Sequence, residues 1–182
     1  MSRNIEIKAH APDLSQIESR ARALADQGPF DLTQDDTFFG CAHGRLKLRE
    51  LAPDHGELIF YQRPDVPGPK LSEYTLAATS TPASMRAALA GALGVVGRVR
   101  KRRRLYLAGQ TRIHLDQVEG LGTFMELEVV LTDSQTAAEG EAIAERLLEQ
   151  LGIRKTDLVS GAYIDHIEQG GAPRGGVARD VR

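Results

Sequence analysis

The sequence predicts an antiparallel α+β protein, and three observations lead to this fold class. Several short segments alternate between apolar and polar residues, which is the period of a half-buried strand. A few other segments carry apolar residues at helical spacing, but they do not alternate regularly with the strands as in a parallel α/β sheet. Short polar connections separate many of the strand segments, which favours antiparallel neighbours.

The first half of the chain begins with a strand and a helix. Residues 4–10 alternate between apolar and polar side chains, so we expect a strand there. Pro12 interrupts this pattern, and Asp13 is suited to cap a helix that ends before Gly28-Pro29. Three further strands are expected, the last two as a hairpin, at residues 35–39, 45–50 and 57–63.

The second half continues with strands and two helices. Thr81-Pro82 fits an N-cap followed by a proline in the first turn, which predicts a helix that stops near Gly94. A second helix is expected at residues 139–151. Strands are expected at 71–77, 99–107, 111–118 and 123–131, with a shorter element at 157–167, all within one domain at 1–169, followed by a disordered Gly- and Arg-rich tail at 170–182.

Composition excludes some classes of protein. The 182 residues include 23 Lys and Arg and 25 Asp and Glu, a net charge of −2, which argues against a general nucleic-acid binder. The single cysteine, Cys41, excludes an intrachain disulfide and favours a reducing compartment. No apolar run approaches the roughly 20 residues of a membrane span, and the start lacks the apolar stretch of a secretory signal, so we expect a cytoplasmic protein without membrane partners.

Several predicted strands have one apolar and one charged face. If the helices cover the apolar faces, the charged faces point either to bulk water or toward one another across a closed sheet. About eight strands can close into a barrel wide enough for one small ligand. The charged faces carry the cations Lys8, Arg45, Lys47, Arg49, Arg63, Lys101, Arg103 and Arg112 and the carboxylates Glu6, Asp116, Glu126 and Glu128.

A closed barrel with this lining is suited to a polyanion that carries a divalent metal. Arg and Lys bind phosphate oxygens, and carboxylates two positions apart on a strand share a face and suit Mg²⁺ or Mn²⁺. The alternative is that these strands are ordinary solvated faces, with Glu126 and Glu128 paired to neighbouring cations. Recurrence of the pattern over many segments favours the closed barrel, but spacing alone leaves both interpretations open.

The basic run at residues 98–104 has a related pair of interpretations. We expect its odd-numbered members to point inward and its even-numbered members to be solvated. Weak RNA binding through the outer set is the alternative. His114, between Arg112 and Asp116 on one face, is expected either to contact the ligand or to make a structural hydrogen bond.

An ordered set of short motifs resembles one known family. Asn4 to Lys8 resembles an N-terminal E-x-E-x-K signature, and Glu126-Leu127-Glu128 resembles an E-x-E strand. Between them, in the expected order, lie Gly44 to Glu50, Tyr61 to Arg63, Lys101 to Arg103 and Arg112 to Asp116. Together they resemble the CYTH superfamily, the triphosphate tunnel metalloenzymes. Asn4 departs from the signature, because it replaces the first glutamate with a neutral amide.

This resemblance implies a closed or nearly closed antiparallel eight-stranded β-barrel with helices packed outside. It implies a divalent-metal-dependent enzyme acting on a triphosphate such as ATP or tripolyphosphate, most closely a class IV adenylate cyclase that makes cyclic AMP and pyrophosphate. A triphosphatase, inorganic or thiamine-specific, is the first alternative, and a non-catalytic polyphosphate- or nucleotide-binding module is the second. The resemblance allows a homodimer.

The same resemblance implies roles for individual residues. Lys8 corresponds to the catalytic lysine, and Mg²⁺ or Mn²⁺ is the implied cofactor. The implied metal ligands are Glu6, Glu126 and Glu128, with Asp116 as a second choice. The implied phosphate-binding residues are Arg45, Lys47, Arg49, Arg63, Lys101, Arg103 and Arg112.

Overall fold

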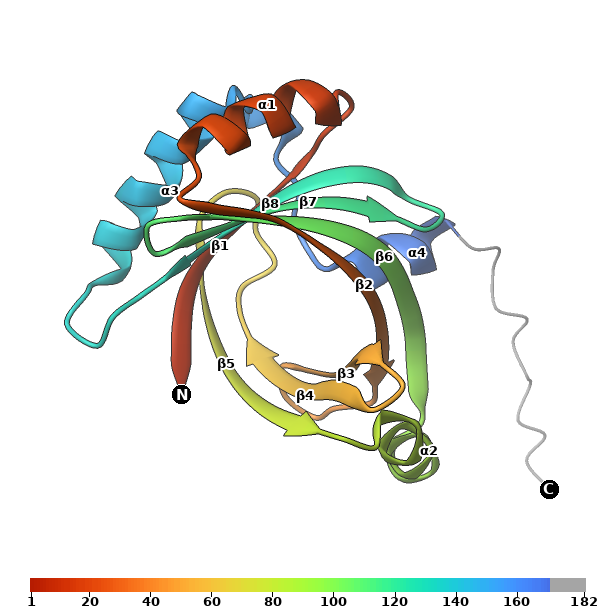
Figure 1. The fold of residues 1–182 in the computed structure, drawn as a ribbon. Helices are drawn as coiled ribbons and strands as arrows, with labels where there is room; N and C mark the ends of the chain where they lie inside the picture. Colours follow the sequence, from red (N-terminus) through yellow and green to blue (C-terminus); the bar gives the residue numbers. More distant parts are fainter. Residues whose placement is uncertain (171–182) are drawn as a thin grey trace.

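The computed structural model of this protein describes residues 1–170 and contains a closed antiparallel β-barrel (Figure 1). Around the barrel the strands follow the order β1-β5-β4-β3-β2-β6-β7-β8. The predicted eight-stranded barrel is therefore confirmed. The strands are β1 (Ser2–His10), β2 (Gln27–Phe39), β3 (Arg45–Ala52), β4 (His55–Gln62), β5 (Lys70–Thr79), β6 (Val95–Ala108), β7 (Thr111–Val118) and β8 (Gly122–Val130).

The predicted strand at 35–39 is too short. Strand β2 starts at Gln27 and pairs along its length with β6, so Gly28-Pro29 lies inside a strand rather than ending a helix. The register shifts between Gln27 and Phe30, as expected where a bulge accommodates a glycine and a proline. This longer ribbon brings the basic strand β6 beside β2.

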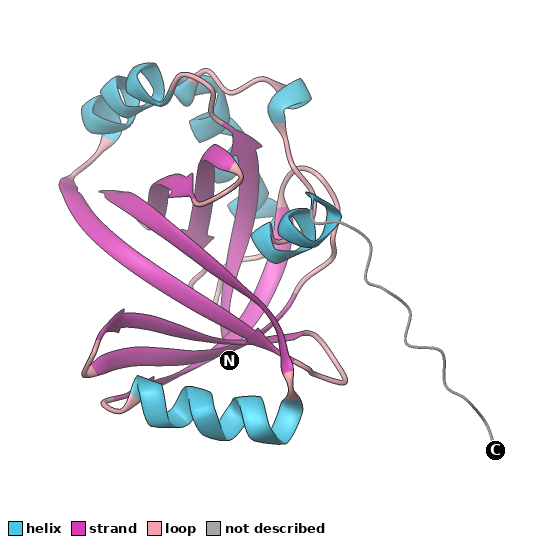
Figure 2. Ribbon diagram, turned by 90° about the vertical axis from the view of Figure 1, so that its right-hand side faces the viewer, coloured by secondary structure: helices cyan, strands magenta, loops and turns pink. Residues whose placement is uncertain are grey.

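Of the four α-helices in residues 1–170, α1 (Leu14–Leu24) and α3 (Ala137–Leu151) lie on one side of the barrel and α2 (Pro82–Leu93) lies on the other (Figure 2). Asp13 caps α1 by accepting a hydrogen bond from the backbone N–H of Gln16, as predicted. Gly140 lets α3 approach β1 closely, because an added Cβ would lie 2.6 Å from Ile5. None of the helices within residues 1–170 combines the length and the apolar character that a transmembrane segment needs.

The main hydrophobic core lies between the barrel wall and helices α1 and α3. Ile5 and Ile7 of β1 point outward into this core and are fully buried. Ile113 of β7 and Leu127 of β8 join them from the neighbouring strands, and Leu151 of α3 packs against them from the helix layer. Because the apolar faces of β1, β7 and β8 are used on the outside, their polar faces point into the barrel.

A second apolar cluster closes one end of the barrel. Phe38, Val99 and Phe124 contribute from the strands, and Tyr163 and Ile164 contribute from α4 (Tyr163–Gly170). The element expected at 157–167 is thus two pieces, the 3₁₀ turn Lys155–Asp157 and α4. The expected disordered tail at 170–182 lies outside the described residues apart from Gly170, which ends α4.

Candidate active site

Two rows of charged side chains cross three neighbouring strands inside the barrel. Directly opposite residues of antiparallel strands project to the same face, so the members of each row are neighbours. Lys8 Nζ lies 4.0 Å from Glu126 Oε1, and Arg112 Nη1 lies 3.2 Å from Glu128 Oε2. From β1 through β8 to β7, the first row is Lys8, Glu126 and His114, and the second is Glu6, Glu128 and Arg112.

Arg103 and Asp116 form the centre of a buried ion-pair network. Arg103 donates to both oxygens of Asp116, at 2.7 and 2.6 Å, and to Glu126 Oε2 at 2.7 Å. Asp116 also accepts hydrogen bonds from Lys101 Nζ at 3.2 Å and Tyr163 Oη at 3.0 Å, and it is fully buried. Burial alone would raise the pKa of Asp116, but Arg103 and Lys101 lower it below its usual range, so this carboxylate stays ionised.

Replacing Arg103 with leucine is expected to destabilise the protein by about 3–5 kcal/mol, because breaking a buried ion pair leaves an uncompensated charge. Urea denaturation followed by circular dichroism measures this loss. The matched control is Arg102→Leu on the same strand, whose side chain is exposed and whose substitution is expected to stay within about 0.5 kcal/mol. A loss below about 1 kcal/mol for Arg103→Leu would contradict the buried network.

A second buried carboxylate, Asp36 of β2, binds two cations of β3. Its oxygens lie 2.9 Å from Lys47 Nζ and 2.9 and 3.0 Å from the guanidinium of Arg49. Burial would raise the pKa of Asp36, but Arg49 and Lys47 hold it well below its usual range. Sequence analysis missed this residue. Its place beside Asp35 in the alternation of β2 was visible in the sequence, but its position opposite Arg49 depends on how β2 pairs with β3.

Lys8 is enclosed by an aromatic ring that sequence analysis did not assign to the site. Its Nζ lies 3.8 Å from the ring centroid of Tyr163, the first residue of α4, a cation–π distance. Burial lowers the pKa of Lys8 to about 8, although the neighbouring Glu126 opposes this change. The lysine therefore carries a more labile proton than an exposed lysine.

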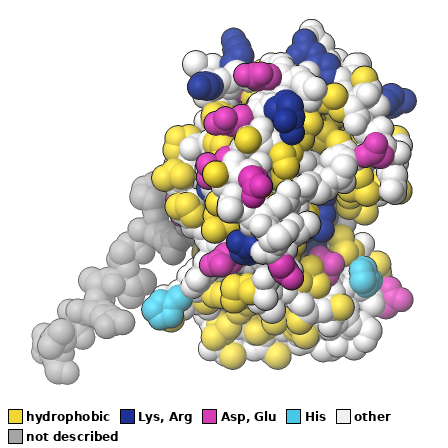
Figure 3. All heavy atoms as spheres, turned by 90° about the vertical axis from the view of Figure 1, so that its left-hand side faces the viewer, with side chains coloured by type: hydrophobic (Ala, Val, Ile, Leu, Met, Phe, Trp, Pro, Cys, Tyr) yellow, Lys and Arg dark blue, Asp and Glu magenta, His cyan; other side chains and the backbone are white. Residues whose placement is uncertain are grey.

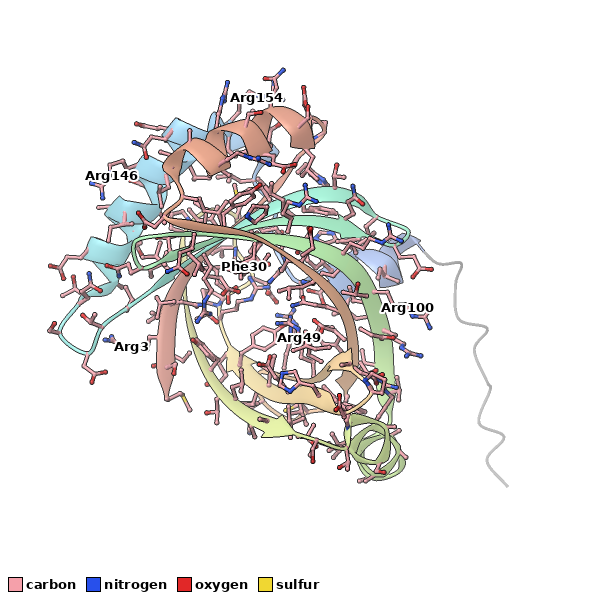
Figure 4. The ribbon with its side chains drawn as sticks, viewed as in Figure 1. Arg3, Phe30, Arg49, Arg100, Arg146 and Arg154 are labelled. Carbon is pink, nitrogen blue, oxygen red and sulfur yellow. The ribbon has the colours of Figure 1, made fainter. Side chains whose placement is uncertain are left out.

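Most of these groups, though not Asp116 or His114, line one cavity of about 270 Å³ inside the barrel. In Figure 4, Arg49 points into the interior of the ring of strands, whereas Arg100 points away from it. Arg63 adds a further ion pair, with Nη1 3.2 Å from Glu6 Oε2. Seven cationic and five acidic side chains line the cavity, namely Lys8, Lys47, Arg49, Arg63, Lys101, Arg103, Arg112, Glu6, Asp36, Glu57, Glu126 and Glu128.

The sequence and the fold both match known proteins. A family model for the CYTH domain matches residues 2–163. This chain belongs to the CYTH family. Adenylate cyclase CyaB of Aeromonas hydrophila is 25% identical to it over 169 residues, which cover 86% of this chain and 85% of that protein.

Solved structures share this CYTH fold. The PH1012 protein of Pyrococcus horikoshii OT3 has a TM-score of 0.77 at 21% identity, covering 89% of this chain and 98% of that one. HpAC1 of Hippeastrum, an adenylyl cyclase candidate described with a dominant triphosphatase activity, has a TM-score of 0.66 at 17% identity, covering 95% of this chain and 98% of its own. Both likenesses show the triphosphate tunnel fold.

Three of the residues singled out by sequence analysis, Arg45, Asp116 and His114, lie apart from the cavity lining of this CYTH barrel. Arg45 pairs with both oxygens of Asp65, at 2.9 and 2.7 Å, and with Asp165 Oδ2 at 2.8 Å. Asp116 lies behind the lining in the network around Arg103. Phosphate binding by Arg45 and metal binding by Asp116 stay predictions. Arg45 would first have to leave Asp65 and Asp165, and Asp116 would have to leave Arg103.

The carboxylates of the CYTH barrel fit a divalent cation. One ligand atom from each of His114, Glu126 and Glu128 can be chosen so that all lie within 4.8 Å of one another. His114 Nδ1 is buried and has no hydrogen-bond partner within the described residues. Two carboxylates beside an imidazole nitrogen form a donor set suited to a divalent cation, with Glu6 in the adjacent row.

The basic run on β6 of this CYTH protein divides as predicted. Lys101 and Arg103 are buried inside the barrel, whereas Arg98, Arg100 and Arg102 are exposed. Arg98 and Arg100 pair with Asp35 on the outer surface. On the face shown in Figure 3, basic and acidic side chains are also interspersed. The outer cations are therefore partly neutralised by neighbouring carboxylates.

Proposed function

We propose that this protein is a divalent-metal-dependent enzyme that binds a triphosphate inside the barrel and acts on its phosphoanhydride chain. The observation that carries this proposal is the convergence of seven cations, six from four strands and Arg63 from just after β4, on one cavity that also holds a carboxylate cluster. The cationic excess suits a polyanion, and the carboxylates suit the metal that accompanies it. Phosphoryl transfer depends mostly on positioning and charge stabilisation, which such a wall provides.

Individual residues have distinct roles in this proposal. Lys47, Arg49, Arg63, Lys101, Arg103 and Arg112 would hold phosphate oxygens. Glu6, Glu126 and Glu128 would hold a divalent cation, which would neutralise charge that develops on the phosphates. Lys8 would orient the attacking oxygen, since its ammonium lies beside Glu126 and is held over the ring of Tyr163.

The first candidate activity is that of a class IV adenylate cyclase, and the CyaB relative supports it. In this reaction the 3′ hydroxyl of ATP attacks the α-phosphorus and loses its proton to solvent, the bond from the α-phosphorus to the oxygen that bridges to the β-phosphate breaks, and cyclic AMP and pyrophosphate are released. Lys8 would orient the hydroxyl, and the arginines of the wall would stabilise the leaving pyrophosphate.

The second candidate activity is a triphosphatase, in which water attacks the terminal phosphorus, the bond to the bridging oxygen breaks with the diphosphate part as leaving group, and orthophosphate forms. The observation that favours it is the charge of the cavity wall, which would suffice to hold a bare triphosphate without an organic group. The Hippeastrum neighbour described with a dominant triphosphatase activity adds support.

A metal-by-substrate screen with product identification tests the proposal. ATP, inorganic tripolyphosphate and thiamine triphosphate are each incubated with the protein in Mg²⁺, Mn²⁺ or EDTA. Cyclic AMP with pyrophosphate identifies the cyclase, and orthophosphate identifies the triphosphatase. If the ligands bind but no substrate yields a product, the protein is a binding module rather than an enzyme.

Tripolyphosphate is expected to raise the melting temperature of the protein by several degrees at millimolar concentration. A ligand that binds only the folded state stabilises it by about 2.7 kcal/mol at a hundredfold excess over Kd, and mutual repulsion of the lining cations is relieved as well. Differential scanning fluorimetry with orthophosphate as the control ligand measures the shift. An unchanged melting temperature would contradict triphosphate binding in the barrel.

A further inference from the structure

A pair of neutral polar side chains lies among the charged groups of the cavity. Asn4 of β1 and Ser72 of β5 are directly opposite each other in the ladder, and both line the cavity. They are 3% and 0% exposed. Asn4 Oδ1 and Ser72 Oγ are buried and have no hydrogen-bond partner within residues 1–170. Buried polar atoms are normally paired, so two adjacent unpaired atoms facing one cavity indicate a missing partner.

The pair lies toward the open end of the cavity. Lys8, four residues further along β1, is at the end that Tyr163 covers. Leu76 lies four residues after Ser72 on β5 and on the same face. It lines the cavity but is 47% exposed, so this end of the cavity opens to solvent. Asn4 and Ser72 therefore lie between the charged interior and the mouth, next to the row that contains Glu6.

The chemistry of the pair differs from that of its surroundings. An amide oxygen accepts one hydrogen bond readily, and a serine hydroxyl both donates and accepts. Neither group carries the charge that binds phosphate oxygens elsewhere in the cavity. A hydroxyl group matches both atoms, because it donates its one proton to the amide oxygen and accepts a hydrogen bond from the serine hydroxyl.

Resting on the proposed function, we propose that Asn4 and Ser72 form a hydrogen-bonding subsite for a hydroxyl on the organic part of the substrate, next to its triphosphate. The substrate class is then a nucleoside triphosphate, in which a sugar is the first unit after the phosphates. Inorganic tripolyphosphate has no group for this subsite.

Calorimetric titration of ATP and tripolyphosphate in excess EDTA, which prevents metal-dependent turnover, tests the subsite. Ser72→Ala and Asn4→Leu are each expected to raise the Kd for ATP about tenfold, the effect of one lost hydrogen bond. The factor by which each variant raises the Kd for ATP is expected to be at least five times the factor for tripolyphosphate. Ser72→Ala removes a single atom, and melting curves of both variants verify that the fold is retained.

Deoxynucleotides identify the recognised group. If the subsite holds a sugar hydroxyl, wild-type protein binds either 2′-deoxy- or 3′-deoxy-ATP about tenfold more weakly than ATP, and Ser72→Ala removes most of that difference. Equal weakening of ATP and tripolyphosphate by both variants, or no deoxy effect in the wild type, would overturn the subsite while triphosphate binding stands. Failure of the wild type to bind either ligand, with or without metal, would instead overturn the proposed function.

Discussion

Simultaneous replacement of Glu126 and Glu128 with glutamine is expected to lower metal-dependent turnover by ~10³-fold or more, a barrier increase of about 4 kcal/mol. Both carboxylates line the cavity and lie within ligand distance of one another. Glutamine keeps the shape of each side chain but removes its charge, so a cation loses its anionic ligands. The loss is measured by comparing the turnover of the variant and the wild type at saturating Mg²⁺ and at saturating Mn²⁺.

The double variant is expected to remain folded. Arg103 keeps its two hydrogen bonds to Asp116 when Glu126 is neutral. A matched control removes two glutamates from an exposed helix surface, at Glu145 and Glu149 of α3, and is expected to retain turnover. Undiminished turnover of the double variant in Mn²⁺ would contradict metal binding by these carboxylates, and its melting temperature separates this outcome from unfolding.

Most of the barrel was predictable because alternation records the two faces of a strand. Residues 4–10 and 99–107 alternate, and the structure buries the apolar members of β1 against helices and the odd-numbered cations of β6 inside the barrel. The first half of β2 was not predictable by the same means. Its glycine and proline are typical breakers, and only pairing with β6 across a bulge makes them part of a strand.

The sequence predicted which charged side chains face the barrel interior better than it predicted which groups pair with them. Alternation places Arg49 inside the barrel but does not say that Asp36 lies opposite it, because the pairing of β2 with β3 depends on tertiary register. Tyr163 reaches Lys8 only because α4 closes the end of the barrel. Arg45 shares its alternation with Arg49, yet it is the first residue of β3 and pairs with Asp65.

Replacement of Arg49 with alanine is expected to lower kcat/KM by ~10²-fold or more, the scale seen when a single charge-stabilising donor is removed from an active site. Arg49 donates to Asp36 through Nε and one terminal nitrogen. A guanidinium has five N–H donors, so the others remain for phosphate oxygens. Initial rates with the best substrate from the screen give the ratio.

The decrease in kcat/KM has two separable causes. The first is the loss of the arginine as a phosphate ligand, and the second is that Asp36 stays buried with Lys47 as its remaining close cation. Asp36 would then draw Lys47 away from substrate and add negative charge to the cavity. The double variant Arg49→Ala with Asp36→Asn removes this second effect, so the part of the loss that it restores belongs to Asp36. Arg102→Ala, which removes an exposed arginine from the outer face of β6, is the charge-matched control. A loss below twofold for Arg49→Ala would show that Arg49 neutralises Asp36 rather than binds substrate.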